Sequence, residues 1–238
     1  MLSSARSEAA LAAELPVPIE IRSMRSSRRL RLRFDEATAT LRLTCPARMS
    51  RRKALAWVLD QRGWIDEQLA LAAPGEPFAV GAMIPVEGRE TRIVWKPDGA
   101  RSPALVGGEL RCGGPAPGVP GRVERFLRKL ALDTMSGEVA EFAAVARVQA
   151  RSVTVGDAAT RWGSCSSRGG IRLSWRLIMA SPQVRRYVVA HEVAHLVHLN
   201  HGPDFKALES RLFGPGLAVA KAALRREGPR LRRIGRGR

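Results

Sequence analysis

All four histidines of the 238-residue chain lie within eleven consecutive positions, from His191 to His201. The run begins with the pattern H-E-x-x-H, formed by His191, Glu192 and His195. On an α-helix, side chains four residues apart project from the same face, so His191 and His195 are spaced to bind one metal ion. Glu192 lies beside them, where its carboxylate is placed to act as a base on a metal-activated water. This spacing indicates a zinc-dependent hydrolase.

The third metal ligand must be chosen between His198 and His201. A catalytic zinc ion usually takes three protein ligands and keeps one position for water. His198 follows His191 by seven residues and would lie on the same helical stripe, which gives poor tetrahedral geometry. His201 meets the ion from another direction if the helix ends first, and Asn200 and Gly202 followed by a proline favour such an end. We therefore predict His201 as the third ligand, in the longer form H-E-x-x-H-x5-H.

Two alternatives to a catalytic centre remain open at this stage. One is a buried helix that carries the short H-E-x-x-H pattern by chance. The other is a structural zinc site, although such sites usually use thiolates and fill all four positions. The pairing of Glu192 with the histidines favours the catalytic interpretation, because this carboxylate is placed to take a proton from water and pass it to the leaving group.

Composition limits the class of protein. Hydrophobic residues make up 45% of the chain, enough for a folded core. Cys45, Cys112 and Cys165 are odd in number and far apart, so we expect a reducing compartment and no disulfide framework. No stretch has the pattern of a signal peptide or the length of a membrane span. These features predict a cytoplasmic protein without a membrane partner.

The formal net charge of +18 is large, and it indicates a nucleic-acid partner or a solvated basic surface. Arginine accounts for 35 of the 40 basic residues, which is typical of a general preference for arginine. The basic residues concentrate in two stretches, 22–33 and 221–238. Aromatic residues are only 5% of the chain, so little stacking surface is available for single-stranded nucleic acid.

The elements expected around the histidines alternate between strands and helices. Apolar residues at period two predict half-buried antiparallel strands near 19–21, 30–34 and 41–43, arranged as a small meander with a turn at Asp35 and Glu36. Apolar residues at helical spacing predict helices at 51–72, with Gly63 as a weak point, and at 122–146. Pro182 fits the first turn of the helix that carries the histidines. Further short strands are expected at 84–86, 91–95, 110–112, 151–155, 161–166 and 171–175, the last two joined at Gly169 and Gly170 as a hairpin.

A loop rich in glycine and proline at 113–120 suggests a boundary between two halves of the chain. The expected organisation is a flexible N-terminus at 1–16, a β-rich region with one helix at 17–120, a catalytic core at 121–226 and a basic tail at 227–238.

Two stretches taken together resemble a known family. One is R-W-G-S-C-S at 161–166, and the other is Y-V-V-A-H-E-V-A-H at 187–195, continuing to Asn200, His201 and Phe205. This combination is similar to the YgjP-like metallopeptidase family, a zincin group, and more distantly to SprT-like and WLM-type proteases. The resemblance is strong from residue 151 to about residue 212. It departs from the family in one place, because Phe205 is followed by Lys206 where a tryptophan is common.

The resemblance implies an α+β fold with a zincin-like core, in which the H-E-x-x-H helix packs under a twisted sheet after an N-terminal β-rich region. It implies zinc ligands at His191, His195 and His201 and a general base at Glu192. It also implies that the strands near 161–166 and 171–175 lie along the cleft, where an edge strand can hold an extended peptide through main-chain hydrogen bonds.

Four residues before the histidines are candidate substrate-binding residues: Arg161, Trp162, Gly163 and Ser164. Arg161 suits an oxyanion, phosphate or carboxylate, and Gly163 permits a close approach of backbone. Trp162 fits a core position equally well, and Ser164 a local hydrogen bond. Cys165 belongs to the same segment, but a small buried cysteine is a simpler interpretation than a metal ligand or nucleophile.

The leading functional prediction is a zinc-dependent metallopeptidase acting on a peptide or protein substrate. One alternative uses the same ion to hydrolyse a nucleotide phosphoanhydride, although the chain has no Gly-rich phosphate loop. The other is a nucleic-acid-associated protein held by its basic ends, with a salt-dependent affinity that removal of residues 221–238 would lower.

Overall fold

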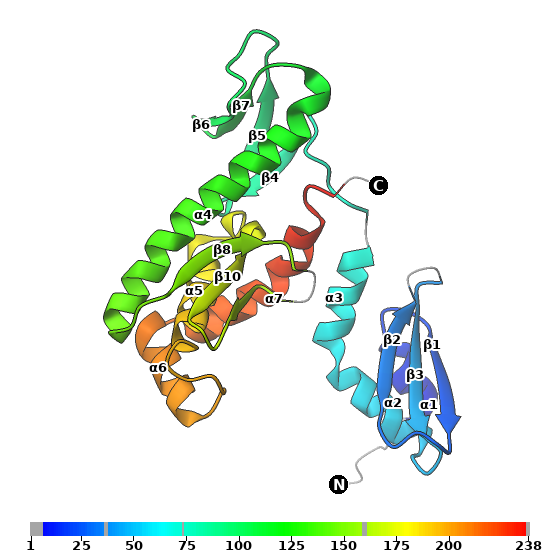
Figure 1. Ribbon diagram of the computed structural model, residues 1–238. Helices are drawn as coiled ribbons and strands as arrows, with labels where there is room; N and C mark the ends of the chain where they lie inside the picture. Colours follow the sequence, from blue (N-terminus) through cyan, green and yellow to red (C-terminus); the bar gives the residue numbers. More distant parts are fainter. Residues whose placement is uncertain (1–6, 36–37, 73, 159–160, 237–238) are drawn as a thin grey trace. The chain divides into compact units, whose positions relative to one another are not determined.

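The computed structural model describes residues 7–35, 38–72, 74–158 and 161–236. Within these residues the protein is a mixed α+β structure with three small β-sheets and several helices (Figure 1). The chain divides into two compact units, Met1–Ala73 and Pro74–Arg238. The sequence predicted a separate catalytic core bounded at residues 120 and 226, and these two boundaries remain predictions. None of the described helices is both long and apolar enough to cross a membrane.

The N-terminal unit combines one three-stranded sheet with three helices in its described part. The apolar side chains of the central strand, Leu41, Leu43 and Cys45, are buried and cluster with Leu55 and Val58 from a helix. Arg42, which lies between the two leucines in the strand, remains at the surface. The elements are α1 (Glu8–Ala13), β1 (Ile19–Met24), β2 (Arg31–Asp35), β3 (Thr40–Pro46), α2 (Arg51–Asp60) and α3 (Arg62–Ala72).

The sheet of this unit differs from the antiparallel meander expected from the sequence. Strand β3 lies in the centre and pairs parallel with β1 and antiparallel with β2. Alternation of apolar residues defines the buried face of each strand, but it does not define which strands pair or in which direction. Among these strands β3 is the most deeply buried, which suits a central position. Half of the turn expected at Asp35 and Glu36 lies outside the described residues.

Two further differences concern the helices of this unit. The segment 1–16 was expected to be flexible, yet its described part contains α1, whose Ser7 side chain accepts a hydrogen bond from the Ala10 backbone N–H (3.2 Å). Leu11 and Leu15 are buried and add to the core. The helix expected at 51–72 is divided at Gln61, which ends α2, while Gly63 lies within α3.

The C-terminal unit places two small sheets around the long helix α4. The buried side chains of α4 include Val123, Leu127 and Met135, and the helix packs against α5, α6, β7, β8 and the short helix η2. The described elements of this unit are β4 (Met83–Val86), β5 (Arg89–Trp95), β6 (Ala104–Val106), β7 (Glu109–Cys112), η1 (Ala116–Gly118), α4 (Val119–Ala146), β8 (Ser152–Gly156), β9 (Gly163–Cys165), β10 (Gly170–Ser174), η2 (Trp175–Ile178), α5 (Pro182–Ala194), α6 (Pro203–Phe213) and α7 (Leu217–Arg233).

The sheet nearest the histidine helix has the order β8-β10-β9. The hairpin expected between residues 161 and 175 is confirmed, because β9 and β10 pair antiparallel and Gly169 supplies the positive φ of +79° at the turn. β10 also pairs parallel with β8. This order leaves β9 at one edge of the sheet, and α5 packs against both β9 and β10.

The arginine-rich end of the chain belongs to the packed fold as far as it is described. Helix α7 continues to Arg233, and Leu231, Arg232 and Ile234 are buried. Ile234 forms an isolated parallel bridge with Glu76, at the start of the same unit. The solvated tail that the sequence suggested for 227–238 is therefore wrong for residues 227–236; residues 237–238 lie outside the description.

Candidate metal centre

Helix α5 carries the start of the histidine run on a segment that is buried on most sides. Pro182 stands in its first turn as expected, and its fixed φ suits that position. Ala190, Val193 and Ala194 are buried around the functional positions. Packing of this kind holds the backbone of the helix in one place and so limits the movement of the side chains that it presents.

The helix ends earlier than the sequence suggested. Ala194 is its last residue and His195 is the C-cap, so the helix ends before it reaches Asn200. The backbone N–H of His198 still donates to the carbonyl of Ala194 (3.0 Å), and the chain then turns. The sequence suggested Pro203 as a residue that prevents α5 from continuing. In the structure it is the first residue of α6. The turn brings His201 back to the end of α5.

The imidazoles of His191, His195 and His201 converge on one point. Nε2 of His201 lies 3.1 Å from Nε2 of His195 and 3.2 Å from Nε2 of His191. A tetrahedral zinc ion with Zn–N bonds of about 2.05 Å separates its ligands by about 3.3 Å. His201 is exposed and the other two are partly buried, so the cluster is open to solvent. The three residues form a candidate metal site.

The other ring nitrogens of the first two histidines have partners that fix the rings. Nδ1 of His191 donates to the buried Glu209 carboxylate, whose Oε1 lies 2.7 Å away. Nδ1 of His195 donates to the His198 carbonyl at 3.0 Å. These bonds favour the tautomer whose Nε2 lone pair is free for a metal. Burial also lowers the pKa of His195, outweighing the opposite effect of the His198 carbonyl, so the neutral form is favoured.

Glu209 was missed by the sequence analysis, although the sequence carried a signal for it. It lies on α6 among Phe205, Leu208 and Leu212, which are the other buried residues of that helix. A carboxylate on an otherwise apolar helix face needs a partner, because burial of an unpaired charge is costly. Phe205 itself packs under the histidines, with ring centroids 5.1 Å from His191 and 4.5 Å from His195.

The predicted base, Glu192, is buried on α5, next to His191 in the chain. Glu192 is only 5% exposed, and its Oε2 has no hydrogen-bond partner in the described part of the chain. Burial raises the pKa of Glu192 to about 7, although the positive charge of Arg161 opposes the shift. A carboxyl group that gains and loses a proton near neutral pH is suited to general acid–base chemistry.

The backbone of Gly163 in β9 makes room for this carboxylate. A Cβ atom at position 163 would lie 2.5 Å from Oε1 of Glu192 and 2.6 Å from its Cγ. Any side chain at 163 would therefore push the carboxyl group away. The close backbone approach that the sequence suggested for Gly163 is confirmed.

The four candidate substrate-binding residues lie together, but their surroundings differ. Arg161, Trp162, Gly163 and Ser164 line a pocket of about 380 Å³ next to β9 and β10. Arg161 is exposed, whereas the Trp162 ring stacks under the Arg232 guanidinium at 4.3 Å from its centroid.

Cys165 lies near Glu192 but outside the histidine cluster. Burial raises the pKa of its thiol, and the Glu192 charge raises it further. A thiol whose pKa is raised is a poor nucleophile and a poor metal ligand at neutral pH, because both roles need the thiolate. Its surroundings therefore favour the simple packing role.

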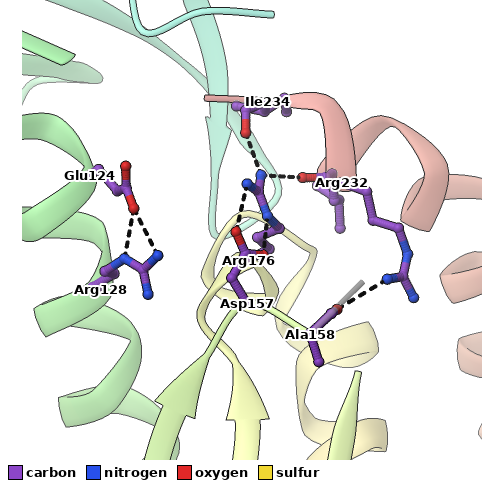
Figure 2. A network of polar contacts seen from close by, with 8 residues as sticks. Glu124, Arg128, Asp157, Ala158, Arg176, Arg232 and Ile234 are labelled. Atoms are coloured by element: carbon purple, nitrogen blue, oxygen red, sulfur yellow. Dashed lines mark hydrogen bonds and ion pairs between the residues drawn. The ribbon is translucent and has the colours of Figure 1, made fainter. Parts of the chain in front are cut away.

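A polar network ties the C-terminal end of the chain to the segment before β9. Arg176 lies at its centre, between Asp157 and Ile234 (Figure 2). Its Nε is 2.7 Å from the Asp157 carboxylate, and its Nη1 donates to the carbonyls of Leu231 (3.0 Å) and Ile234. Arg232 donates to the Ala158 carbonyl at 3.3 Å. Burial alone would raise the pKa of Asp157, but the hydrogen bond and charge of Arg176 outweigh it and hold the pKa below its usual value.

Comparisons with known proteins identify a family and a solved structure that are similar to this chain. The family model described as YgjP-like, metallopeptidase domain, matches residues 28–227. Among solved structures, the crystal structure of the metallopeptidase zymogen of Pyrococcus abyssi abylysin matches 42% of this chain and 97% of its own chain, with 19% identity and a TM-score of 0.36. A search of curated proteins finds no match.

Proposed function

Because the chain belongs to the YgjP-like metallopeptidase family, we propose that it is a zinc-dependent peptidase with His191, His195 and His201 as ligands and Glu192 as general base. The observation that carries this proposal is the convergence of three Nε2 atoms beside a buried carboxylate that lacks a partner in the described part of the chain. Three imidazoles with an open fourth side are the ligand set of a catalytic zinc ion.

The donor set fits zinc better than a hard cation. Nitrogen ligands suit zinc and other first-row transition metals, whereas calcium and magnesium prefer oxygen. The carboxylate of Glu209 on His191 raises the basicity of the ring, as is usual for zinc-binding histidines. A zinc ion bound there would supply Lewis-acid activation of water and of the scissile carbonyl.

Glu192 moves the proton. Its carboxylate accepts the proton of the attacking water and then passes it to the leaving nitrogen, which needs a group whose pKa is near neutral. Burial of Glu192 keeps bulk water away from the proton on the carboxyl group. Gly163 leaves the space in which this carboxylate sits.

The edge strand β9 supports a peptide as the substrate. Backbone hydrogen bonds run from Ser166 N to Gly170 O (2.9 Å) and from Ser174 N to Trp162 O (2.7 Å). In an antiparallel pair, alternate residues point their backbone groups toward the neighbour. Gly163 and Cys165 therefore turn theirs toward the open edge, where an extended peptide can add as a further strand beside Glu192. The zincin-like arrangement, with the histidine helix packed against this sheet, belongs to the same proposal.

Metal content and peptide cleavage together test the proposal. Purified wild-type protein should contain about one zinc per chain by plasma mass spectrometry. His201→Ala should lose it, whereas His198→Ala should keep it, because His198 holds His195 through its backbone carbonyl and not its side chain. The matched pair thus separates ligand loss from a general effect of removing an imidazole.

Unfolded casein and a set of nucleoside triphosphates serve as substrates in the same assay. The peptidase proposal predicts casein cleavage that a zinc chelator abolishes and Glu192→Gln eliminates. Hydrolysis of nucleotides without peptide cleavage would replace it with the phosphoanhydride alternative. Absence of any bound transition metal after zinc reconstitution would remove the metal centre itself.

A further inference from the structure

The outward face of the sheet in the N-terminal unit is crowded with arginines. In the register of the three strands, Arg22 and Arg31 flank Thr44, and Arg33 lies beside Arg42. Successive side chains of a strand point to opposite faces, so these arginines share the face away from the buried leucines. Like charges directly opposite each other on neighbouring strands do not stabilise a sheet, so this grouping is not explained by strand pairing.

The connection between β1 and β2 adds Arg28 and Arg29 to the same surface. Together with the strands it lines a concave region of about 800 Å³, in which six arginines stand against one acidic residue, Glu20. We call Arg22, Arg28, Arg29, Arg31 and Arg33 the arginine face.

The charges of the arginine face have no counter-ions in the described part of the chain. Arg42 is neutralised by Asp35 (2.9 Å) and Glu20 (3.5 Å). The side chains of the arginine face, by contrast, make no ion pair or hydrogen bond with any described residue, and all five residues are exposed. Five uncompensated positive charges therefore surround one hollow.

The second basic stretch of the sequence behaves differently. Arg230 pairs with Glu90 (2.7 Å) and Glu76 (3.2 Å), and Arg233 pairs with Glu76 (3.3 Å). Arg232 stacks on the Trp162 ring. These arginines hold the C-terminal unit together and have less charge to offer a partner. The unpaired charges of the arginine face, by contrast, are gathered around one hollow.

We propose that the arginine face binds the phosphate backbone of a nucleic-acid duplex without reading its sequence. Duplex DNA carries about one negative charge per 1.7 Å, the charge density that such a cluster matches best. One strand, β3, lies between Arg22 and Arg31, so two strand spacings set their backbones about 10 Å apart. This separation lies between the widths of the two grooves of duplex DNA, about 6 and about 12 Å.

The lining of the face argues against other anionic partners. It contains no aromatic side chain among its described residues, so bases of a single strand have no surface to stack on. Met24 and Leu30 are its only partly exposed apolar side chains among the described lining residues, too few to insert into a membrane. Arginine also binds phosphate through two parallel hydrogen bonds, which a duplex offers at every step. This binding function lies beyond the peptidase centre and does not depend on it.

Fluorescence anisotropy with the full-length protein and a labelled duplex DNA of about 20 base pairs tests the proposal across a salt series. Arg22→Gln/Arg31→Gln/Arg33→Gln should weaken binding at least about tenfold at about 0.1 M salt and reduce the slope of log K against log salt by about 3. Arg28→Gln/Arg29→Gln, in the connection outside the sheet, should reduce that slope by about 2. This second variant still tests the proposal if the variant with three changes in the strands folds poorly.

The matched control is Arg51→Gln/Arg52→Gln/Lys53→Gln, which removes three exposed charges from the start of α2 in the same unit. It should bind nearly as tightly as the wild type. An equal loss in this control, or no binding by the wild type, would overturn the proposal.

Duplex RNA, single-stranded DNA, polyglutamate and vesicles containing anionic lipid complete the set of probes. Duplex DNA or duplex RNA binding above the rest supports the proposal and identifies the nucleic acid. Equal or tighter binding of single strands, polyglutamate or vesicles would show that the face serves another class of partner.

Discussion

Gly163 and Glu192 are in such close contact that a Cβ atom at position 163 would lie 2.5 Å from the carboxylate oxygen Oε1. The contact joins the edge strand β9 to the histidine helix α5 at the group proposed as the base. It explains why a glycine stands in the R-W-G-S segment, since only a residue without a side chain leaves space for the carboxyl group.

Gly163→Ala should therefore keep the metal and lose activity. The added methyl group displaces the Glu192 carboxylate, so we expect casein cleavage to fall by a factor of about 100 or more, in line with the contribution of general base catalysis. Zinc content should stay at the wild-type level. Gly137→Ala is the control, because position 137 has nothing within 4 Å of a new Cβ, and it should cleave normally. Equal activity in both variants would contradict the proposed contact.

Glu192→Gln should stabilise the metal-free protein while it eliminates turnover. The pKa of Glu192 is raised from 4.5 to about 7 in the folded state. The folded protein therefore binds more protons than the unfolded chain between these values, and stability falls as pH rises through that range. The amide avoids this cost, which is on the order of 3 kcal/mol at most. Thermal unfolding of metal-free protein should give Glu192→Gln a melting temperature several degrees above wild type at pH 8, and nearly the same value at pH 4.

Activity should decline on the acid side for the same reason. The base must be deprotonated, so protonation of Glu192 removes it, and a bound cation lowers the pKa below the metal-free value of about 7. The acid limb of log(kcat/KM) should therefore have a midpoint at or below about pH 7. Activity that rises steadily as pH falls below 6 would be inconsistent with a carboxylate base.

The sequence located the candidate centre because its signals are local. His191 and His195 are one helical turn apart, and a histidine beyond the helix end completes the set, so spacing along the chain was enough to predict the cluster. Gly163 was also accessible, since a glycine in a strand often marks a close approach. The roles of these residues in binding metal and in catalysis stay proposals.

Other features depend on contacts between distant parts of the chain, which periodicity does not reveal. The parallel pairing of β1 with β3 follows from where strands meet in space. Arg232 was assigned to a tail, yet it stacks on Trp162, 70 positions earlier, as the numbering shows. A basic residue that forms part of a core has the same appearance in sequence as one on a solvated surface.

Glu209→Gln should weaken metal binding without abolishing it. The amide still accepts a hydrogen bond from His191 Nδ1, but it lacks the negative charge that makes the ring a stronger ligand. We expect zinc affinity to fall by a factor of about 10 to 100, measured by competition with a chromophoric chelator. Glu227→Gln removes a partly exposed carboxylate from α7 and serves as the control. An unchanged zinc affinity in Glu209→Gln would show that this carboxylate does not support the ligand.

Truncation after Glu227 should destabilise the C-terminal unit strongly. It removes the Leu231 and Ile234 carbonyls that accept hydrogen bonds from Arg176, a side chain only 5% exposed. The guanidinium then keeps only the Asp157 carboxylate and the Trp175 ring among its described contacts. Loss of a partner from a buried charge costs about 3–5 kcal/mol, which corresponds to a fall in melting temperature of roughly 6–20 °C for a unit of this size. Arg225→Ala/Arg226→Ala removes charge from the same helix without touching the network and should melt near the wild type. A truncated protein as stable as the wild type would mean that residues 228–238 form a dispensable tail and that Arg176 does not need them.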